Sequence, residues 1–86
     1  MSNSQIGLAS CLIQLKYGPE MGHLVMVIGG SDFITLKQIE LRIASYPGAT
    51  NVTIRPKDIG RMIGRLIWHK YAEFKNINDR AHYKIR

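Results

Sequence analysis

A helical repeat of apolar side chains between residues 59 and 75 constrains the fold more than any other feature of this chain. Side chains that recur at spacings of three and four residues lie on one face of an α-helix. The members of this stripe are Ile59, Met62, Ile63, Leu66, Ile67 and Phe74. Asp58 precedes it and has the side chain of an N-cap residue. A helix with this pattern has to bury its stripe, so we expect a second layer of structure against it.

Two segments in the first third of the chain have the patterns of β-strands. Residues 11–17 alternate between inward apolar and outward polar positions, which is typical of a half-buried strand. Residues 23–28 form a short apolar run that is followed by two glycines, as in a central strand or in a strand covered by a partner. The glycines and the proline of residues 18–22 suit a turn. We therefore expect an antiparallel hairpin over residues 11–28.

A second helix is predicted over residues 35–46. Thr35 and Gln38 have the spacing of a capping box, in which each side chain bonds the backbone of the other. The apolar residues that follow fall on one helical face. Pro47 and Gly48 then end the helix.

The remaining segments complete a mixed α+β fold. Residues 50–55 alternate as a third strand that stops at Pro56, and residues 81–86 alternate again, as a fourth strand or as a tail that orders on binding. The predicted order is β-β-α-β-α, with or without a final β. We expect one domain, residues 1–86, with a small antiparallel sheet and two helices on one of its faces.

Length and cysteine content narrow the class of protein further. A domain of 86 residues has a thin core, for which oligomerisation is a common remedy. Cys11 is the only cysteine, which excludes an intrachain disulfide and suits a small core residue. No positive charge precedes the first apolar stretch, and no apolar run is long enough to span a membrane. We expect a soluble protein of a reducing cytoplasm, the host cytoplasm if the protein is viral.

The excess of positive charge lies entirely in residues 44–86. They hold nine of the twelve Lys and Arg and three of the six acids, whereas residues 1–43 hold three of each. Aromatic side chains are interleaved with this charge, and the combination is typical of a nucleic-acid surface. A solvated basic tail is the alternative. Within the basic helix and tail, residues 55–86, the candidate nucleic-acid-binding residues are Arg55, Lys57, Arg61, Arg65, Trp68, His69, Lys75, Arg80, His82, Lys84 and Arg86.

A four-residue unit is repeated within the basic helix. Residues 59–66 are Ile-Gly-Arg-Met-Ile-Gly-Arg-Leu, so Gly60 and Gly64 form a strip beside Arg61 and Arg65. Each glycine costs about 0.8–1 kcal/mol of helix stability relative to alanine, and a close backbone approach should compensate. Three partners could supply that approach: a helix that crosses at the glycines, as in a homodimer, the face of a strand, or a phosphate backbone. Packing against protein, by a helix or by a strand, is favoured over a phosphate backbone. A homodimer accounts for a large part of that expectation.

Helical spacing extends the arginine strip through Trp68 and His69 to Lys75. An exposed Trp offers a π-face to an unpaired base, worth about 1–3 kcal/mol per stacked base. Alternatively, Trp68 packs under the C-terminal tail against Tyr83 or Ile85, because Trp is highly buried on average. The sequence leaves both arrangements open.

The residues that catalysis would need are sparse. His69 and Glu73 are four apart and could share a hydrogen bond or a metal, but two ligands do not make a site. A small RNA-cleaving toxin could use His69 or His82 as an acid or base with the arginines, although no spacing fixes such a geometry. We therefore expect no enzyme, no cofactor and no metal.

The chain resembles small bacteriophage accessory proteins in its size, its basic charge and the stretch Glu-Phe-Lys-Asn-Ile-Asn-Asp-Arg at residues 73–80. Among them it is similar in character to the RNA-binding inhibitors of an RNA-cleaving toxin from a toxin–antitoxin system, the ToxN-inhibitor type. The resemblance covers chiefly residues 55–86. It implies a dimeric RNA binder that acts on a host toxin through shared RNA.

The sequence thus favours a non-enzymatic RNA-binding protein of low specificity that forms a homodimer. RNA is preferred over DNA because no helix-turn-helix pattern is evident and exposed aromatic side chains suit unpaired bases. A protein-binding inhibitor that docks its basic face on an acidic partner is the alternative, and a small RNase toxin is a further one.

Overall fold

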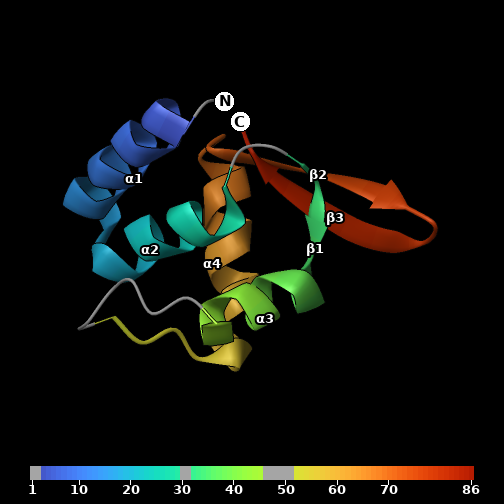
Figure 1. Ribbon diagram of the computed structural model, residues 1–86. Helices are drawn as coiled ribbons and strands as arrows, with labels where there is room; N and C mark the ends of the chain where they lie inside the picture. Colours follow the sequence, from blue (N-terminus) through green and yellow to red (C-terminus); the bar gives the residue numbers. More distant parts are fainter. Residues whose placement is uncertain (1–2, 30–31, 46–51) are drawn as a thin grey trace.

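The computed structural model describes residues 3–29, 32–45 and 52–86, and Figure 1 shows how their elements are arranged. Four helices precede a β-hairpin, and a short strand lies between the second and third helices. The elements are α1 (Asn3–Tyr17), α2 (Pro19–Ile28), β1 (Ile34–Thr35), α3 (Leu36–Ser45), α4 (Pro56–Trp68), β2 (Ala72–Ile77) and β3 (Arg80–Ile85). The mixed α+β class is confirmed, but the predicted order of elements is wrong, and four helices stand where two were expected.

All three strands form one antiparallel sheet in the order β1-β3-β2. Helices α2, α3 and α4 pack together beside it, and each contributes fully buried side chains to a single core. Leu24 of α2, Ile39 of α3 and Leu66 of α4 are completely buried, and Ile85 of β3 joins them. The hairpin therefore ends in the same core that holds the helices (Figure 1).

The strands predicted over residues 11–17 and 23–28 are wrong, because both segments are helical. In α1 the inward positions are Ile6, Ser10, Ile13 and Tyr17, a spacing of three and four residues that the alternation of residues 11–17 obscured. Residues 23–28 are apolar on nearly all sides because α2 is enclosed by its neighbours. A short apolar run does not distinguish a buried helix from a buried strand.

Helices α1 and α2 approach closely at Gly22. Ser10 Oγ donates a 2.7 Å hydrogen bond to the carbonyl oxygen of Gly22. A Cβ atom at Gly22 would lie 2.8 Å from Gln14 Cβ and 2.9 Å from the Ser10 carbonyl oxygen. Glycine is therefore required at this crossing, and the turn expected over residues 18–22 is confined to Gly18, where φ is +104°.

The end of α2 is held by a side chain from α3. Arg42 Nη1 donates to the carbonyl oxygens of Val27 and Ile28, at 3.3 and 3.1 Å. These carbonyls have no partner within the helix, and a cation at a helix C-terminus also interacts favourably with the helix dipole. Arg42 thus ties α3 to α2.

The predicted capping box at the start of α3 is confirmed. The Gln38 backbone N–H donates to Thr35 Oγ1 at 3.2 Å, and the Thr35 backbone N–H donates to Gln38 Oε1 at 2.9 Å. The predicted range of 35–46 agrees with α3 within a residue at the start, while residue 46 lies outside the described residues.

Helix α4 starts earlier than predicted. It begins at Pro56, which occupies the first helical position, where a missing N–H costs nothing. Asp58 is therefore not the N-cap but a residue of the first turn, where its charge suits the helix dipole. The strand expected over residues 50–55 is wrong for residues 52–55, which form no strand, and residues 50–51 lie outside the described range.

Helix α4 also ends seven residues before the predicted end. The Tyr71 N–H bonds to the Leu66 carbonyl oxygen at 2.8 Å, and the Lys70 N–H bonds to that of Ile67 at 3.0 Å. This pair of bonds is a Schellman motif, and Lys70 takes the left-handed conformation it needs, with φ at +65°. Phe74 consequently belongs to β2 and not to the apolar stripe of the helix.

Strands β2 and β3 form a hairpin with a two-residue turn. Asn78 and Asp79 both have positive φ, +52° and +63°, as a type I′ turn requires. The predicted strand over residues 81–86 is confirmed as β3, which starts one residue earlier. Its partner, β2, was missed because residues 72–75 were assigned to the preceding helix.

Candidate nucleic-acid interface

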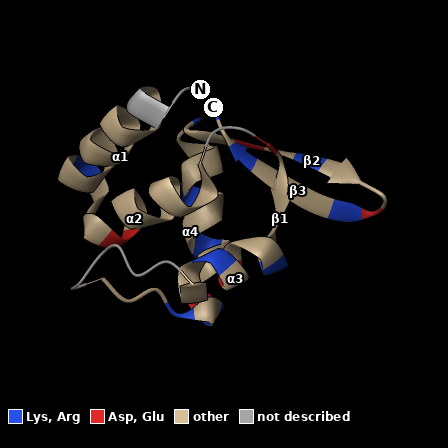
Figure 2. Ribbon diagram, in the orientation of Figure 1, with Lys and Arg blue, Asp and Glu red and all other residues tan. Residues whose placement is uncertain are grey.

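The outward face of α4 is basic and uncovered. The apolar stripe, Ile59, Met62, Ile63 and Leu66, is buried as predicted, whereas every other residue from Arg55 to Arg65 except Asp58 is exposed. Figure 2 shows the blue Lys and Arg positions spread over α3, α4 and the hairpin. We refer to Lys57, Gly60, Arg61, Gly64 and Trp68 as the α4 face.

The two glycines of the α4 face have open space around them. A Cβ atom built at Gly60 or at Gly64 would meet no atom of the described residues within 4 Å. The expectation that a strand face presses against them is therefore wrong for the described part of the chain. Both glycines have ordinary helical φ, so the backbone conformation does not require them either. Nothing in the described part of the fold offsets the helix stability that these two glycines cost.

The arginines of α4 differ in their surroundings. Arg61 Nη2 lies 3.6 Å from Asp58 Oδ1, in a surface ion pair in which the Arg61 side chain is 72% exposed. Such a pair contributes little and leaves Arg61 able to contact a phosphate. Arg65 turns toward α1, where its guanidinium carbon lies 5.8 Å from the centre of the Tyr17 ring. Arg61 is thus the better placed of the two for an external anion.

Trp68 ends α4 with 83% of its surface exposed. The alternative in which it packs under the C-terminal tail is therefore wrong: Ile85 is buried in the core, and Trp68 lies outside it. A large apolar side chain left in water at the end of a basic helix face is available for stacking or for a partner.

His69 belongs to a different surface. Its ring lies 5.0 Å from that of Tyr17 and 6.4 Å from that of Tyr71, in a cluster between α1 and the end of α4. Because the helix ends at Trp68, His69 and Glu73 do not share a helical face as predicted. Glu73 Oε2 instead lies 3.7 Å from Arg86 Nε, in a second surface ion pair.

The hairpin presents its cations on the sheet face that points away from the core. Ala72 and Ile85 pair on the core face, so by alternation Lys75, Arg80 and Lys84 occupy the opposite one. Lys75 pairs with His82 across the strands, and the amino groups of Lys75 and Lys84 lie 5.3 and 5.7 Å from the centre of the Phe33 ring. We refer to Lys75, Arg80, His82 and Lys84 as the hairpin face.

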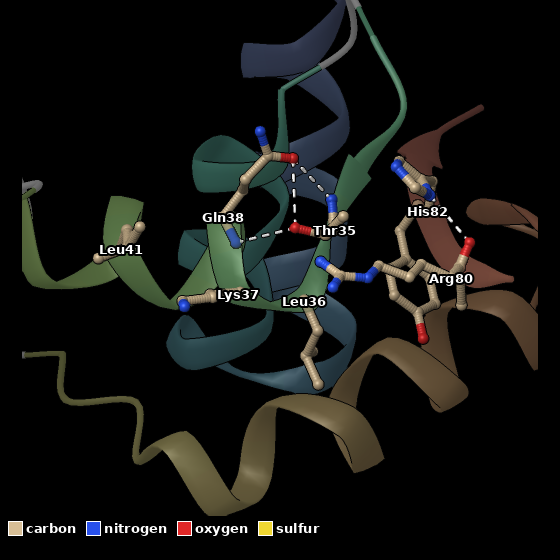
Figure 3. Close-up of a pocket in the computed structure, with 9 residues that line it drawn as sticks. Thr35, Leu36, Lys37, Gln38, Leu41, Arg80 and His82 are labelled. Atoms are coloured by element: carbon tan, nitrogen blue, oxygen red, sulfur yellow. Dashed lines mark hydrogen bonds between the residues drawn. The ribbon is translucent and has the colours of Figure 1, made fainter. Parts of the chain in front are cut away.

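A hollow of about 610 Å³ lies between the hairpin face and the start of α3. Figure 3 shows Arg80 and His82 on the β3 side and Thr35, Lys37 and Gln38 on the α3 side. His82 Nδ1 is 2.9 Å from the Arg80 carbonyl oxygen, to which it donates when protonated. Two cations and several hydrogen-bonding groups therefore line one open depression.

The predicted single strip from Arg61 to Lys75 is thus divided between two elements. Lys57, Arg61 and Trp68 lie on α4, and Lys75 lies on the hairpin face with Arg80 and Lys84. Arg55 precedes α4 and is exposed. The sequence did not indicate Phe33 or Lys37 as part of the site, because only the pairing of β1 with β3 brings them to the hairpin.

Two kinds of site were searched for in the described residues and not found. Among residues 3–29, 32–45 and 52–86, no three His, Cys, Asp or Glu side chains gather where a metal ion could bind. None of the helices in these ranges is long and apolar enough to cross a membrane.

Comparisons with protein-family models, with curated proteins and with solved structures found no match. The resemblance to phage RNA-binding inhibitors accordingly stays a prediction.

Proposed function

We propose that this protein binds duplex DNA, with α4 lying in a groove and the hairpin face against the neighbouring phosphates. The observation that most supports this proposal is the α4 face, where Lys57 and Arg61 are exposed beside two glycines with open space around them. RNA was preferred on the sequence because no helix-turn-helix pattern was evident. In the structure the two predicted helices, α3 and α4, follow each other without the strand that was expected at residues 52–55 between them.

The order of elements supports this proposal. A strand, two helices and a hairpin follow each other, and the last strand lies in the middle of the sheet. This is the element order of winged helix-turn-helix domains, in which the second helix of the pair enters the major groove. Element order is an analogy, so the chemistry of the residues has to carry the function.

The dimensions of α4 suit a groove. The major groove of B-DNA is about 12 Å wide, and an α-helix with its side chains is about 10–12 Å across. Gly60 and Gly64 remove side-chain volume from the side of the helix that faces outward, so its backbone can approach the bases or phosphates closely. The otherwise uncompensated cost of these glycines is then offset by binding.

In the proposed complex, five cations of the two faces contact phosphates: Lys57, Arg61, Lys75, Arg80 and Lys84. Each neutralised phosphate releases counterions, which lowers the slope of log K against log salt concentration by about 0.9. We therefore expect a slope of about −4 to −5 for the wild-type protein, and a slope about one unit shallower when any one of these side chains is neutralised.

One observation favours a second candidate, the RNA binding expected from the sequence. Trp68 is 83% exposed, and an unpaired base could stack on its indole ring. Trp68→Ala should then abolish most of the affinity for a single strand. A duplex has no unpaired base to offer, so the same substitution should cost duplex affinity far less than a change at Arg61.

Fluorescence anisotropy with a short random DNA duplex and single-stranded RNA of equal length tests both candidates. Arg61→Glu should weaken duplex binding about tenfold or more, which is about 1.4 kcal/mol. Lys16→Glu is the matched control, because it changes the net charge equally on α1, outside both faces. Equal losses for both variants would show that only net charge matters. Tighter binding to RNA that depends on Trp68 would favour the second candidate.

A further inference from the structure

The hollow between β3 and the start of α3 has the size of a small-molecule site. Its volume of about 610 Å³ lies within the range of about 300–1,000 Å³ that is usual for ligand pockets. The hollow is there because β1 is short. The chain turns into α3 directly after Thr35, so β1 reaches only Tyr83 and His82 of β3. Arg80 and Ala81 have no strand beside them on that side and line the hollow instead.

All the Lys, Arg, Asp and Glu side chains that line this hollow carry positive charge. Figure 3 shows Lys37 on the α3 side and Arg80 extended from β3 toward α3, and none of the 9 lining residues is Asp or Glu. The ion pairs within the described part of the chain lie elsewhere, on α4 and between β2 and the C-terminal residue. The first turn of α3 contains no acidic residue either. A concave surface with charge of one sign attracts a ligand of the opposite sign.

Other side chains of the hollow add hydrogen-bonding groups and an apolar wall. His82 Nδ1 is 2.9 Å from the Arg80 carbonyl oxygen, which orients the imidazole ring and leaves Nε2 for a ligand. Gln38 accepts through Oε1 in the capping box, so its amide nitrogen remains as a donor. Leu36 and Leu41 form an apolar part of the lining. The hollow therefore has groups for an anion and room for an organic group beside it.

We propose that this hollow binds a small organic phosphate monoester. A monoester carries a charge of about −1.5 to −2 at pH 7, which matches two cations in one hollow. Each phosphate of a nucleic-acid backbone carries a single negative charge. Arg80 can form two parallel hydrogen bonds with one phosphate group, and Lys37 contacts it as a point charge. Leu36 and Leu41 then contact the organic group.

The proposed ligand would share one residue with duplex DNA. Arg80 is among the five cations that we propose to contact the duplex, so the ligand and the duplex would compete for its guanidinium group. That consequence rests on the proposed function, whereas the binding of the ligand does not.

A nuclear magnetic resonance titration of nuclease-treated, isotopically labelled protein with phenyl phosphate tests the proposal. The backbone amide signals of residues 36–38 and 80–83 should shift until they saturate, while those of α4 should not. Phenyl sulfate has nearly the same shape but a single negative charge, and it should bind more weakly. The amide spectrum also shows whether each variant is folded.

Two variants with the same chemical change separate the hollow from net charge. Lys37→Gln should raise the dissociation constant of phenyl phosphate about tenfold, because a hydrogen-bonded charge is lost from the hollow. Lys84→Gln is the matched control, because Lys84 lies on the same strand as Arg80 but contacts Phe33 outside the hollow. This variant should leave the dissociation constant within about twofold of the wild type.

Three results would overturn the proposal. They are shifts that do not saturate at millimolar phenyl phosphate, equal losses in Lys37→Gln and Lys84→Gln, and binding of phenyl sulfate as tight as that of phenyl phosphate. Arg80→Gln provides a second variant of the hollow and should weaken binding at least as much as Lys37→Gln. All these titrations are made without nucleic acid, so their failure would leave the DNA-binding proposal untouched.

Discussion

Replacing both exposed glycines of α4 with alanine should stabilise the fold and weaken its binding. Each glycine in a helix interior costs about 0.8–1 kcal/mol relative to alanine, and no described atom lies within 4 Å of a Cβ at Gly60 or Gly64. The double variant Gly60→Ala, Gly64→Ala should therefore gain about 1.5–2 kcal/mol of unfolding free energy. For a domain of this size the midpoint of thermal unfolding should rise by about 10 °C.

The same variant should lose affinity for duplex DNA, because two added methyl groups hold the helix backbone away from the groove. Thermal denaturation followed by circular dichroism gives the first quantity, and anisotropy with a labelled duplex gives the second. A variant that is more stable but binds as tightly as the wild type would refute the role of the glycines in binding. A variant without added stability would refute the description of the α4 face as uncovered.

Gly22→Ala is the control within the same chain. The helix propensity gain is equal, but the new Cβ would meet Gln14 Cβ at 2.8 Å and the Ser10 carbonyl oxygen at 2.9 Å. The helices α1 and α2 would have to separate, and forced repacking of this kind typically costs about 1–3 kcal/mol. We expect the midpoint of thermal unfolding to fall in Gly22→Ala and to rise in the double variant.

Two further predictions concern the ends of helices. Lys70→Gly should raise the unfolding free energy by about 1 kcal/mol, because glycine adopts φ of +65° without steric cost, whereas Lys70→Ala should give no such gain in the same thermal assay. Arg42→Ala should lower it by about 1–3 kcal/mol, because the carbonyl oxygens of Val27 and Ile28 lose a charged donor. Lys37→Ala, an exposed change on the same helix, should stay within about 0.5 kcal/mol in urea denaturation.

Where the sequence pattern was local, it predicted structure well. Thr35 and Gln38 are three residues apart, and the bonds they form need nothing from the rest of the chain. The apolar stripe of α4 was identified because Ile59, Met62 and Leu66 have only one helical face to bury. β3 was found because its side chains alternate around buried Ile85. These features depend on neighbours in the sequence alone.

Tertiary context decided the elements that were missed. Residues 11–17 were assigned to a strand because Ile13 and Leu15 were expected to lie on one buried side, whereas α1 buries Ile13 and exposes Leu15. The end of α4 depends on Lys70 in a left-handed conformation, which a lysine does not signal. The hairpin turn uses Asn78 and Asp79 rather than the more recognisable Asn-Gly.

The candidate site was predicted in its residues but not in its arrangement. The basic side chains from Arg55 to Lys84 were named, yet they were placed on one helix. Within a short stretch of sequence, the positions of Lys and Arg do not show whether these residues lie on a helix or on a strand. Phe33 and Lys37 come from a distant segment, and only the pairing of β1 with β3 brings them to the site.

The two edges of the sheet differ in how they can meet another chain. β1 is only two residues long, which is too short to act as a template for a foreign strand. β2 is a six-residue edge, and Glu73 and Lys75 are the charges along it. Lysine on an edge strand discourages edge-to-edge pairing, so Lys75 would also keep the protein from aggregating, besides the phosphate contact that we propose for it. Variants that test binding at Lys75 should therefore replace it with a polar residue, because an apolar one would open β2 to self-association.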